Sequence, residues 1–296
     1  MAALGFIGLG NMGLPMLRNL LAAGHQVRAF DLVATALDAA VAAGARAAPS
    51  VGEAAADAEF VLTMLPEGRH VREVYLGSDG VIARAGAEAL LIDCSTIDVE
   101  TARAINVAAG ERGLEVVDAP VSGGVGGATA ATLTFMVGGS DGGFARAQPL
   151  LQQMGKAVIH TGSSGNGQAA KICNNLMLGI SMIGVCEAFV LADRLGLSAE
   201  KLFEVTNQSS GQCWASTNYS PVPGLVPTSP ANRDYEAGFT AAMMAKDLRL
   251  AQAAANDVAI PNPMGAQARN LFALFASGDR KGMDFSAIIK LIAGEL

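Results

Sequence analysis

Gly8-Leu9-Gly10-Asn11-Met12-Gly13 is the stretch of sequence that decides the fold. It follows a strand-like run, Leu4 to Gly8, and opens a segment of helical composition, which is the context of a dinucleotide-binding βαβ unit. In such a unit Gly8 permits a tight turn, Gly10 lets the backbone approach a pyrophosphate, and Gly13 lets the helix pack closely on the sheet. The N–H groups and the positive dipole end of the helix attract the phosphates. The dinucleotide site is therefore predicted to include Gly8, Gly10, Asn11, Met12 and Gly13.

Asp31 stands at the end of the second expected strand, Gln26 to Phe30. An acidic side chain at this point accepts hydrogen bonds from the adenosine ribose hydroxyls of NAD. The extra 2′-phosphate of NADP would face the carboxylate, and neither Leu32 nor Val33 supplies a compensating arginine. The sequence therefore predicts NAD as the cofactor. The alternative is that Asp31 only caps the turn after the strand.

Short β-rich runs alternate with Ala-rich helical stretches up to about His160, which is typical of βαβ units on a parallel sheet. The segment Thr161 to Gly167 is the strongest loop signal, and the strand signal disappears after it. We therefore expect an α/β protein, with a Rossmann-type doubly wound parallel sheet in residues 1–164 and an all-α domain in residues 165–296. The expected strands are Leu4 to Gly8, Gln26 to Phe30, Phe60 to Met64, Leu90 to Asp93, Glu115 to Asp118, Leu133 to Val137 and Ala157 to His160. The expected helices include Val99 to Arg112 and Phe144 to Met154, closed by Gly113 and Gly155, and then Ala169 to Leu195, Ala199 to Asn207, Ala241 to Asn256 and Pro263 to Ala276.

The composition suits a globular enzyme and excludes other classes. Hydrophobic residues make up 51% of the chain and charged residues 16%, unlike a disordered or fibrous protein. The formal charge is −7 without a basic cluster, so nucleic acid is not an expected partner. We see no export signal at the N-terminus. The apolar stretch Leu176 to Ala192 carries Ser181 and Glu187, which would be costly in lipid, so we expect no membrane span.

The cysteines and histidines show no ligand spacing. The cysteines lie far apart without a Cys-x-x-Cys pair, so neither a disulfide framework nor a zinc site is indicated, and a reducing cytoplasm is the expected location. The histidines are equally scattered, so we expect no metal ion. These residues are Cys94, Cys173, Cys186, Cys213, His25, His70 and His160.

Two more strand ends are expected to complete the cofactor crevice, because ligands of such sheets bind outside the carboxyl ends of the strands. They read Met64-Leu65-Pro66 and Cys94-Ser95-Thr96. Each could instead be ordinary, since a proline after a strand is common and Ser95 and Thr96 could cap the following helix.

A glycine-dense segment, Asp118-Ala-Pro-Val-Ser-Gly-Gly-Val-Gly-Gly127, follows another strand. Its backbone N–H groups and the Ser122 hydroxyl could form a nest for a carboxylate. The alternative is a flexible glycine loop without a ligand.

A lysine and two amides stand at the mouth of an otherwise apolar helix. In Gly167-Gln-Ala-Ala-Lys-Ile-Cys-Asn-Asn175, the residues Gly167, Lys171 and Asn175 are four apart and share one helix face. An ammonium group buried there tends to lose its proton, which suits a base. Hydride transfer from a carbinol carbon to nicotinamide leaves a hydroxyl proton that Lys171 could accept while Asn175 aligns the hydroxyl. The alternative is a lysine that extends along apolar surface to water.

The length of this apolar helix has a further consequence. Such a helix has to be covered on nearly every side, and the helical half of the chain offers little bulk to cover it. We therefore expect a homodimer or homotetramer formed through the second domain.

Together these segments resemble the β-hydroxyacid dehydrogenase family over essentially the whole chain. The matching segments are Gly5 to Gly13, Asp118 to Gly124, Gly167 to Asn175 and Lys246 to Leu248. The resemblance implies that Lys171 is the acid/base and that Lys246 closes the site, although a Lys-Asp pair within a helix is more often solvated. The residues with implied roles are Lys171 and Asn175 in catalysis, Ser122, Gly123, Gly124, Asn175 and Lys246 in substrate binding, and Leu65, Pro66, Thr96 and Lys246 in cofactor binding.

The resemblance is strongest to the branch that oxidises 3-hydroxyisobutyrate to methylmalonate semialdehyde in valine breakdown. Tyr219-Ser-Pro-Val-Pro-Gly224, preceded by Trp214, looks like the loop of that branch. L-serine and tartronate semialdehyde or glycerate remain alternatives, because one methyl group in an apolar pocket changes binding by only about 1–3 kcal/mol. A non-catalytic dinucleotide-sensing module is the alternative of another class, and Lys171 and Asn175 argue against it.

Overall fold

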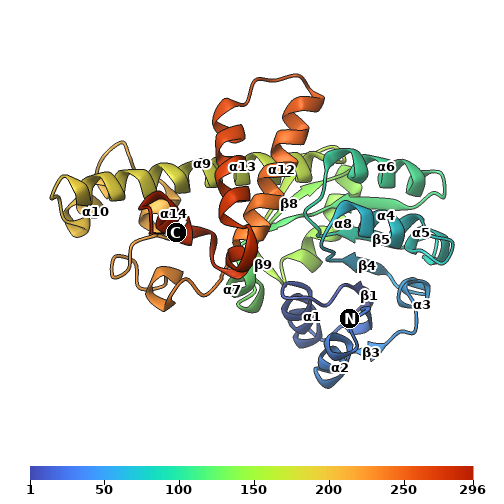
Figure 1. The fold of residues 1–296 in the computed structure, drawn as a ribbon. Helices are drawn as coiled ribbons and strands as arrows, with labels where there is room; N and C mark the ends of the chain where they lie inside the picture. Colours follow the sequence, from blue (N-terminus) through green and yellow to red (C-terminus); the bar gives the residue numbers. More distant parts are fainter. Residues whose placement is uncertain (296) are drawn as a thin grey trace. The chain divides into compact units, whose positions relative to one another are not determined.

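The computed structural model describes residues 1–295 and divides into two compact units, Met1–Lys171 and Ile172–Leu296. Figure 1 shows the first unit in blue to yellow-green and the second in yellow to red. Lys171, the last residue of the first unit, lies inside helix α9 (Asn166–Arg194). The domain boundary expected after residue 164 falls just before this helix and stays a prediction.

The first unit is built on a nine-stranded sheet with the order β3-β2-β1-β4-β5-β6-β8-β7, and β9 pairs with β8. The strands from β3 to β6 in this order are all parallel. The chain runs from β1 outward to β3 and then from β4 outward to β6, so the sheet is doubly wound with a switch point between β1 and β4. The strands are β1 (Ala3–Ile7), β2 (Gln26–Phe30), β3 (Arg46–Ala47), β4 (Phe60–Thr63), β5 (Leu90–Asp93), β6 (Glu115–Asp118), β7 (Val121–Ser122), β8 (Leu133–Gly138) and β9 (Gly155–Gly162).

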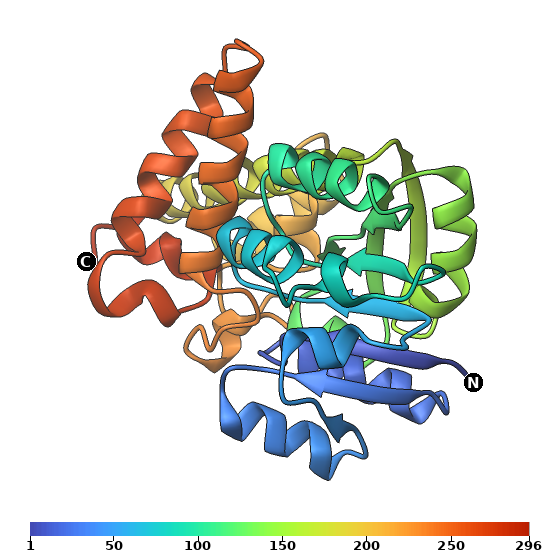
Figure 2. The same ribbon diagram turned by 90° about the vertical axis from the view of Figure 1, so that its right-hand side faces the viewer.

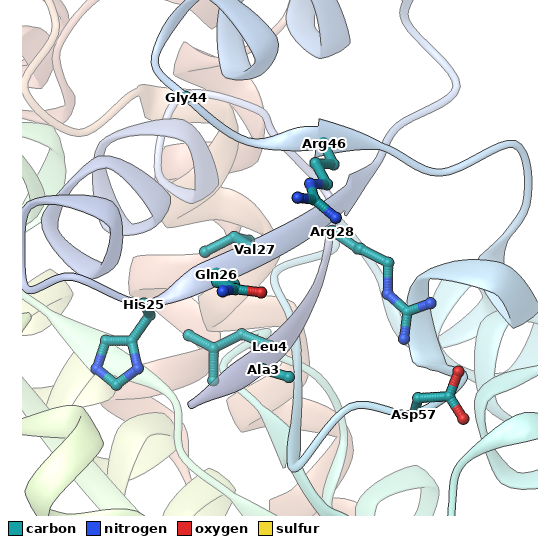
Figure 3. A pocket seen from close by; sticks show the side chains of 9 residues that line it. All are labelled: Ala3, Leu4, His25, Gln26, Val27, Arg28, Gly44, Arg46 and Asp57. Atoms are coloured by element: carbon teal, nitrogen blue, oxygen red, sulfur yellow. The ribbon is translucent and has the colours of Figure 1, made fainter. Parts of the chain in front are cut away.

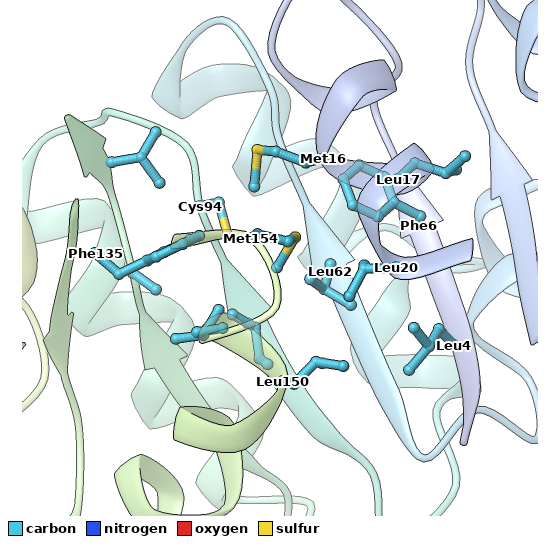
Figure 4. Packing of buried hydrophobic residues seen from close by; sticks show 14 of the residues in the cluster. Leu4, Phe6, Met16, Leu17, Leu20, Leu62, Cys94, Phe135, Leu150 and Met154 are labelled. Atoms are coloured by element: carbon cyan, nitrogen blue, oxygen red, sulfur yellow. The ribbon is translucent and has the colours of Figure 1, made fainter. Parts of the chain in front are cut away.

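Helices cover both faces of this sheet (Figure 2). Strand residues alternate between two apolar cores: Leu62 packs in the cluster that contains Met16 and Leu17, whereas its neighbour Val61 packs with Val71. Figure 4 shows the first of these clusters, in which side chains from β1, β4 and α1 interdigitate. The helices of the first cluster are α1 (Gly13–Ala22), α2 (Ala34–Ala42), α7 (Gly124–Thr129) and α8 (Asp141–Leu151). Those of the second are α3 (Val51–Ala55), α4 (Gly68–Leu76), α5 (Val81–Arg84) and α6 (Val99–Gly110).

The second unit is helical, and its core forms where α9 meets α12 and α13. Met182 of α9, Met244 of α12 and Phe272 of α13 are fully buried in one cluster. A Cβ at Gly179 would lie 2.9 Å from the Leu248 side chain, so α9 and α12 approach closely at this point. The α-helices after α9 are α10 (Ala199–Asn207), α11 (Trp214–Thr217), α12 (Ala241–Asp257), α13 (Pro263–Phe275) and α14 (Ile288–Ile292).

The expected fold class, a Rossmann-type sheet followed by a helical region, is confirmed, and three details differ from expectation. β8 runs antiparallel to β6 and β7 and parallel to β9, so the sheet is not parallel throughout. The glycine-dense segment contains β7 and the short helix α7 (Gly124–Thr129). Gly155 begins β9 and does not close α8, which ends at Leu151.

Helix α9 is long and apolar enough to cross a membrane by length and composition alone. Its most apolar window has a mean hydropathy of 1.8, and 39% of that window is buried within the chain. A core helix of a soluble protein passes the same test, so this property by itself indicates no span.

Candidate active site

The glycine turn after β1 is tightly packed on one side and open on the other. Gly8 has a φ of +95°, and a Cβ there would lie 2.4 Å from the Met64 carbonyl oxygen. A Cβ at Gly13, the first residue of α1, would lie 1.9 Å from the Gly8 carbonyl oxygen. A Cβ at Gly10 would meet no atom within 4 Å. Packing within the protein therefore requires glycine at Gly8 and Gly13, whereas the space in front of Gly10 is free for a ligand.

The turn and the helix start carry the other two residues of the motif. Asn11 is exposed and Met12 is half-buried, and Met12 is the residue that immediately precedes α1. The first turn of α1 contains no acidic residue, so nothing there opposes an anion at the positive end of the helix.

Asp31 follows β2, and its carboxylate binds the glycine turn. One oxygen accepts the Leu9 N–H at 2.6 Å and the other accepts the Val33 N–H at 2.7 Å. Each oxygen has a further lone pair with which to accept a ribose hydroxyl. Leu32 and Val33 beside it are 90% and 57% exposed, so apolar side chains and not cations flank the carboxylate. The open face at Gly10 together with Asp31 fits NAD.

The carboxyl ends of β4 and β5 are connected by Ser95. Its hydroxyl oxygen accepts the Leu65 N–H at 2.8 Å, which joins the turn after β4 to the turn after β5. Leu65 and Thr96 are half-buried and Pro66 is exposed in these turns. Because a Cβ at Gly8 would touch Met64, the glycine turn lies beside the end of β4. The structure thus brings the expected cofactor residues from β1, β2, β4 and β5 to one edge of the sheet.

A buried polar group underlies these turns. Asp93 accepts a hydrogen bond from the Thr63 hydroxyl at 2.7 Å and from the Ser95 N–H at 3.1 Å. The Tyr75 hydroxyl lies 3.1 Å from that of Thr63. Burial, followed by the charge of Asp93, raises the pKa of Tyr75 well above its usual value, so the phenol stays neutral.

The segment that was expected to bind the substrate carboxylate is a strand, a turn and a helix. Ser122 ends β7, Gly123 precedes α7, and Gly124 begins it. Gly123 and Gly124 have φ values of +134° and +61°, which favour glycine. Ser122 and Gly124 are half-buried and Gly123 is exposed, so the reversal of the chain presents backbone to solvent.

Asp118 and Gly167 place the start of α9 at the end of β6. The Asp118 carboxylate accepts the N–H groups of Gly165 at 2.7 Å and Gln168 at 2.9 Å, as a helix cap does. Burial raises the pKa of Asp118 to about 6, and the two backbone hydrogen bonds oppose that increase. A Cβ at Gly167 would lie 2.4 Å from the Met136 carbonyl oxygen, so the close approach needs glycine. Lys171, 7% exposed, follows one turn later on α9.

Asn175, Lys246 and Asp247 form one polar group in the second unit. Asn175 donates through Nδ2 to Asp247 and accepts through Oδ1 from Asn174 at 3.0 Å. Lys246 Nζ lies 3.6 Å from an Asp247 oxygen. The Lys246 and Asp247 side chains are only 18% and 5% exposed, so the interpretation of this pair as solvated is wrong.

A pocket of about 420 Å³ opens elsewhere in the first unit (Figure 3). It is lined by the first residues of β1 and β2 and by His25, Arg28, Arg46 and Asp57. These strands begin there, so the pocket lies at the amino edge of the sheet. Ligands of doubly wound sheets bind at the carboxyl edge, where the glycine turn and Asp31 lie.

Sequence reasoning assigned no role to several residues that shape this edge. Gln168 is fully buried and bonds to the loop after β5, and Asp118 caps α9, although both stand inside motifs that were singled out. Asp247 likewise stood beside Lys246 without a role. The only sequence signal for a role of Gln168 was its position one helical turn before Lys171, the candidate base.

Two family models cover most of the chain. One, described as the NAD binding domain of 6-phosphogluconate dehydrogenase, matches residues 3–162. The other, described as NAD-binding of NADP-dependent 3-hydroxyisobutyrate dehydrogenase, matches residues 165–292. The chain belongs to the β-hydroxyacid dehydrogenase family.

Three relatives of this β-hydroxyacid dehydrogenase match over nearly their full length. The chain is 52% identical to a 3-hydroxyisobutyrate dehydrogenase of Pseudomonas aeruginosa, and the match covers 100% of both chains. It is 48% identical to an NAD-dependent L-serine dehydrogenase of the same organism, covering 98% of each. A solved structure of Mycobacterium tuberculosis 3-hydroxyisobutyrate dehydrogenase with L-serine superposes with a TM-score of 0.95 at 49% identity, covering 99% of both chains. The chain is therefore an NAD-dependent oxidoreductase that acts on the CH–OH group of a small hydroxy acid.

Proposed function

We propose that this β-hydroxyacid dehydrogenase oxidises 3-hydroxyisobutyrate to methylmalonate semialdehyde with NAD, as in valine breakdown, and that Lys171 transfers the proton. The observation that carries the proposal is the position of Lys171. Its side chain is buried one turn into α9, and Asp118 caps that helix at the carboxyl edge of the sheet. The expected cofactor residues lie at the same edge, which supports a role for the Lys171 amine beside the bound cofactor.

Oxidation of a carbinol removes a hydride from carbon and a proton from oxygen. Bound NAD supplies the hydride acceptor. The neutral amine of Lys171 accepts the hydroxyl proton while the C–O bond gains double-bond character, and the ammonium returns it in the reverse reaction. The step therefore requires Lys171 to be neutral when the alcohol binds.

The remaining site residues are proposed to bind and orient the substrate. Ser122 and the backbone of Gly123 and Gly124 bind the carboxylate, since the turn presents N–H groups and a hydroxyl. Asp247 fixes the orientation of the Asn175 amide, because a carboxylate accepts only from the Nδ2 side. One N–H of that amide can then bind a substrate oxygen, and Lys246 adds a positive charge.

A panel of substrates tests the proposed preference. We expect kcat/KM for 3-hydroxyisobutyrate to exceed that for L-serine, 3-hydroxypropionate and glycerate by about tenfold or more, because a methyl group in an apolar pocket contributes that much. Both enantiomers of 3-hydroxyisobutyrate are assayed under steady-state conditions. A higher kcat/KM for L-serine would move the assignment to that substrate, which the names of two similar proteins also mention.

Asp31→Ser should reduce the preference for NAD over NADP by about tenfold or more, since it removes a carboxylate that repels a 2′-phosphate. The measurement is kcat/KM for each cofactor at saturating substrate. Asp38→Ser is the matched control, because Asp38 is exposed on α2 and should leave the ratio unchanged. A parent enzyme that is more efficient with NADP contradicts the role of Asp31.

We further propose that the enzyme is a cytoplasmic homodimer or homotetramer that associates through α9. One stripe of this helix is exposed and almost free of charge: Met177 and Leu191 are 62% and 60% exposed, and Leu195, directly after the helix end, continues it at 76%. Gly184 and Ala188 lie between them on the same stripe and are exposed too. An apolar stripe of this length usually marks an interface, and a second copy presents the same stripe.

Replacing Leu191 and Leu195 together with glutamate should weaken self-association by about a hundredfold or more, because the interface would bury unpaired charges. Sedimentation equilibrium at micromolar concentration measures the change. Val107→Glu is the control, since Val107 is 63% exposed on α6 of the first unit. A parent protein that sediments as a monomer removes the proposal.

A further inference from the structure

We propose that Gln168 is a positioning residue, which sets the distance between Thr96 in the cofactor crevice and Lys171 on α9. This inference rests on the proposed role of Lys171 and names a residue that acts through it. All of the residues concerned belong to the first unit.

The Gln168 amide binds the loop after β5 at two backbone atoms. Its Nε2 donates to the Ser95 carbonyl oxygen at 2.8 Å, and its Oε1 accepts the Ile97 N–H at 3.0 Å. These contacts determine the orientation of the amide, because the reverse orientation would place two donors together and two acceptors together. Gln168 is fully buried, so no water competes for either hydrogen bond.

Thr96 is the residue between the two backbone atoms that Gln168 binds. The amide therefore spans Thr96 and fixes the backbone on both sides of it. Ser95 extends the connection, since its hydroxyl oxygen accepts the Leu65 N–H in the turn after β4. One side chain of α9 is thus connected through hydrogen bonds to both turns that are expected to line the cofactor.

The other end of the connection is the helix that carries the base. Gln168 and Lys171 are three residues apart on α9 and lie on neighbouring positions of its surface. The Gln168 N–H also donates to Asp118, so the backbone at this residue is fixed while its side chain binds the loop. A shift of α9 relative to the β5 loop would therefore break the hydrogen bonds that Gln168 makes with Ser95 and Ile97.

Gln168→Met tests the proposal, because methionine keeps the length of the side chain and removes both hydrogen bonds. We expect kcat to fall by about 10- to 100-fold, as for a misplacement of about 1 Å, with little change in the dissociation constant of NAD. Kinetics are measured at a temperature at which circular dichroism shows the variant to be folded. A kcat within twofold of the parent overturns the proposal.

Gln168→Glu supplies a rescue that a purely structural role would not show. A protonated glutamic acid can donate to the Ser95 oxygen and accept from Ile97 as the amide does, whereas the carboxylate cannot donate. The ratio of its kcat to that of the parent should therefore rise as the pH is lowered. A ratio that stays flat with pH counts against the proposal, and it does so even if Gln168→Met fails to fold.

Asn166→Ala is the matched control at the same helix start. The Asn166 side chain donates to the Thr161 carbonyl oxygen at 3.0 Å and does not bind the β5 loop. We expect it to lower the melting temperature and leave kcat unchanged. Lys171→Ala in the same assay distinguishes the proposed function from the positioning role of Gln168. Full activity of Lys171→Ala would contradict the proposed function. An inactive Lys171→Ala together with a fully active Gln168→Met would contradict the positioning role alone.

Discussion

Lys171→Ala should lower kcat by about 10²- to 10⁴-fold, because it removes the group that accepts the hydroxyl proton. The dissociation constant of NAD, measured by fluorescence titration, should change little, so the defect lies in chemistry and not in cofactor binding. In the parent, kcat for oxidation should fall on the acid side of its pH profile, since a protonated amine cannot accept a proton. The variant should lose this dependence.

Lys201→Ala is the control for the removal of a lysine. Lys201 lies on α10 in an exposed ion pair with Glu204 at 2.9 Å, and such pairs contribute little to stability. Its kcat should equal that of the parent. A Lys171→Ala enzyme that turns over substrate as fast as the parent would end the proposed mechanism.

Gly10→Ala and Gly13→Ala should separate the two reasons for glycine in the turn. A methyl group at Gly13 collides with the Gly8 carbonyl oxygen, so we expect a loss of about 1–3 kcal/mol or more in the free energy of unfolding. A methyl group at Gly10 meets no protein atom, so the melting temperature of the cofactor-free protein should not change. Affinity for NAD should nevertheless fall by about tenfold or more, because the methyl group occupies the space in which the pyrophosphate would approach.

Thermal unfolding without NAD and titration with NAD measure these two effects independently. Gly86→Ala is a suitable control, since a Cβ there also meets no atom within 4 Å and Gly86 lies outside the site. Unchanged NAD affinity in Gly10→Ala would show that the dinucleotide does not pass over this residue.

The parts of the fold that could be predicted are those with local signals. The glycine turn, the alternation up to β6 and the helices of the second half follow from spacing and composition within short windows. The direction of β8 could not be predicted, because it depends on which strands pair, and β3 and β7 are too short to show a periodicity. The glycine-dense segment contains a helix that its composition disfavours, so packing overrides propensity there.

The site residues that could be predicted are likewise those with local signals. Lys171 and Asn175 could be recognised because their spacing on one helix is visible in the sequence. The contacts of Gln168 with Ser95 and of Asp118 with Gly165 join residues that are 73 and 47 positions apart, and only the folded chain reveals them. The burial of Asp247 could not be predicted either, since nothing in the neighbouring sequence distinguishes its buried carboxylate from a solvated one.

The buried cap of α9 links folding of the enzyme to proton uptake. The pKa of Asp118 rises from 3.8 to about 6 on folding, so the folded chain binds a proton more tightly than the unfolded chain. Its contribution to stability is complete below about pH 4 and is lost as the pH rises through about 6, a difference of about 3 kcal/mol. At neutral pH the helix that carries Lys171 thus begins at a carboxylate whose burial favours the acid form, so mild acidification should raise the free energy of unfolding of the enzyme.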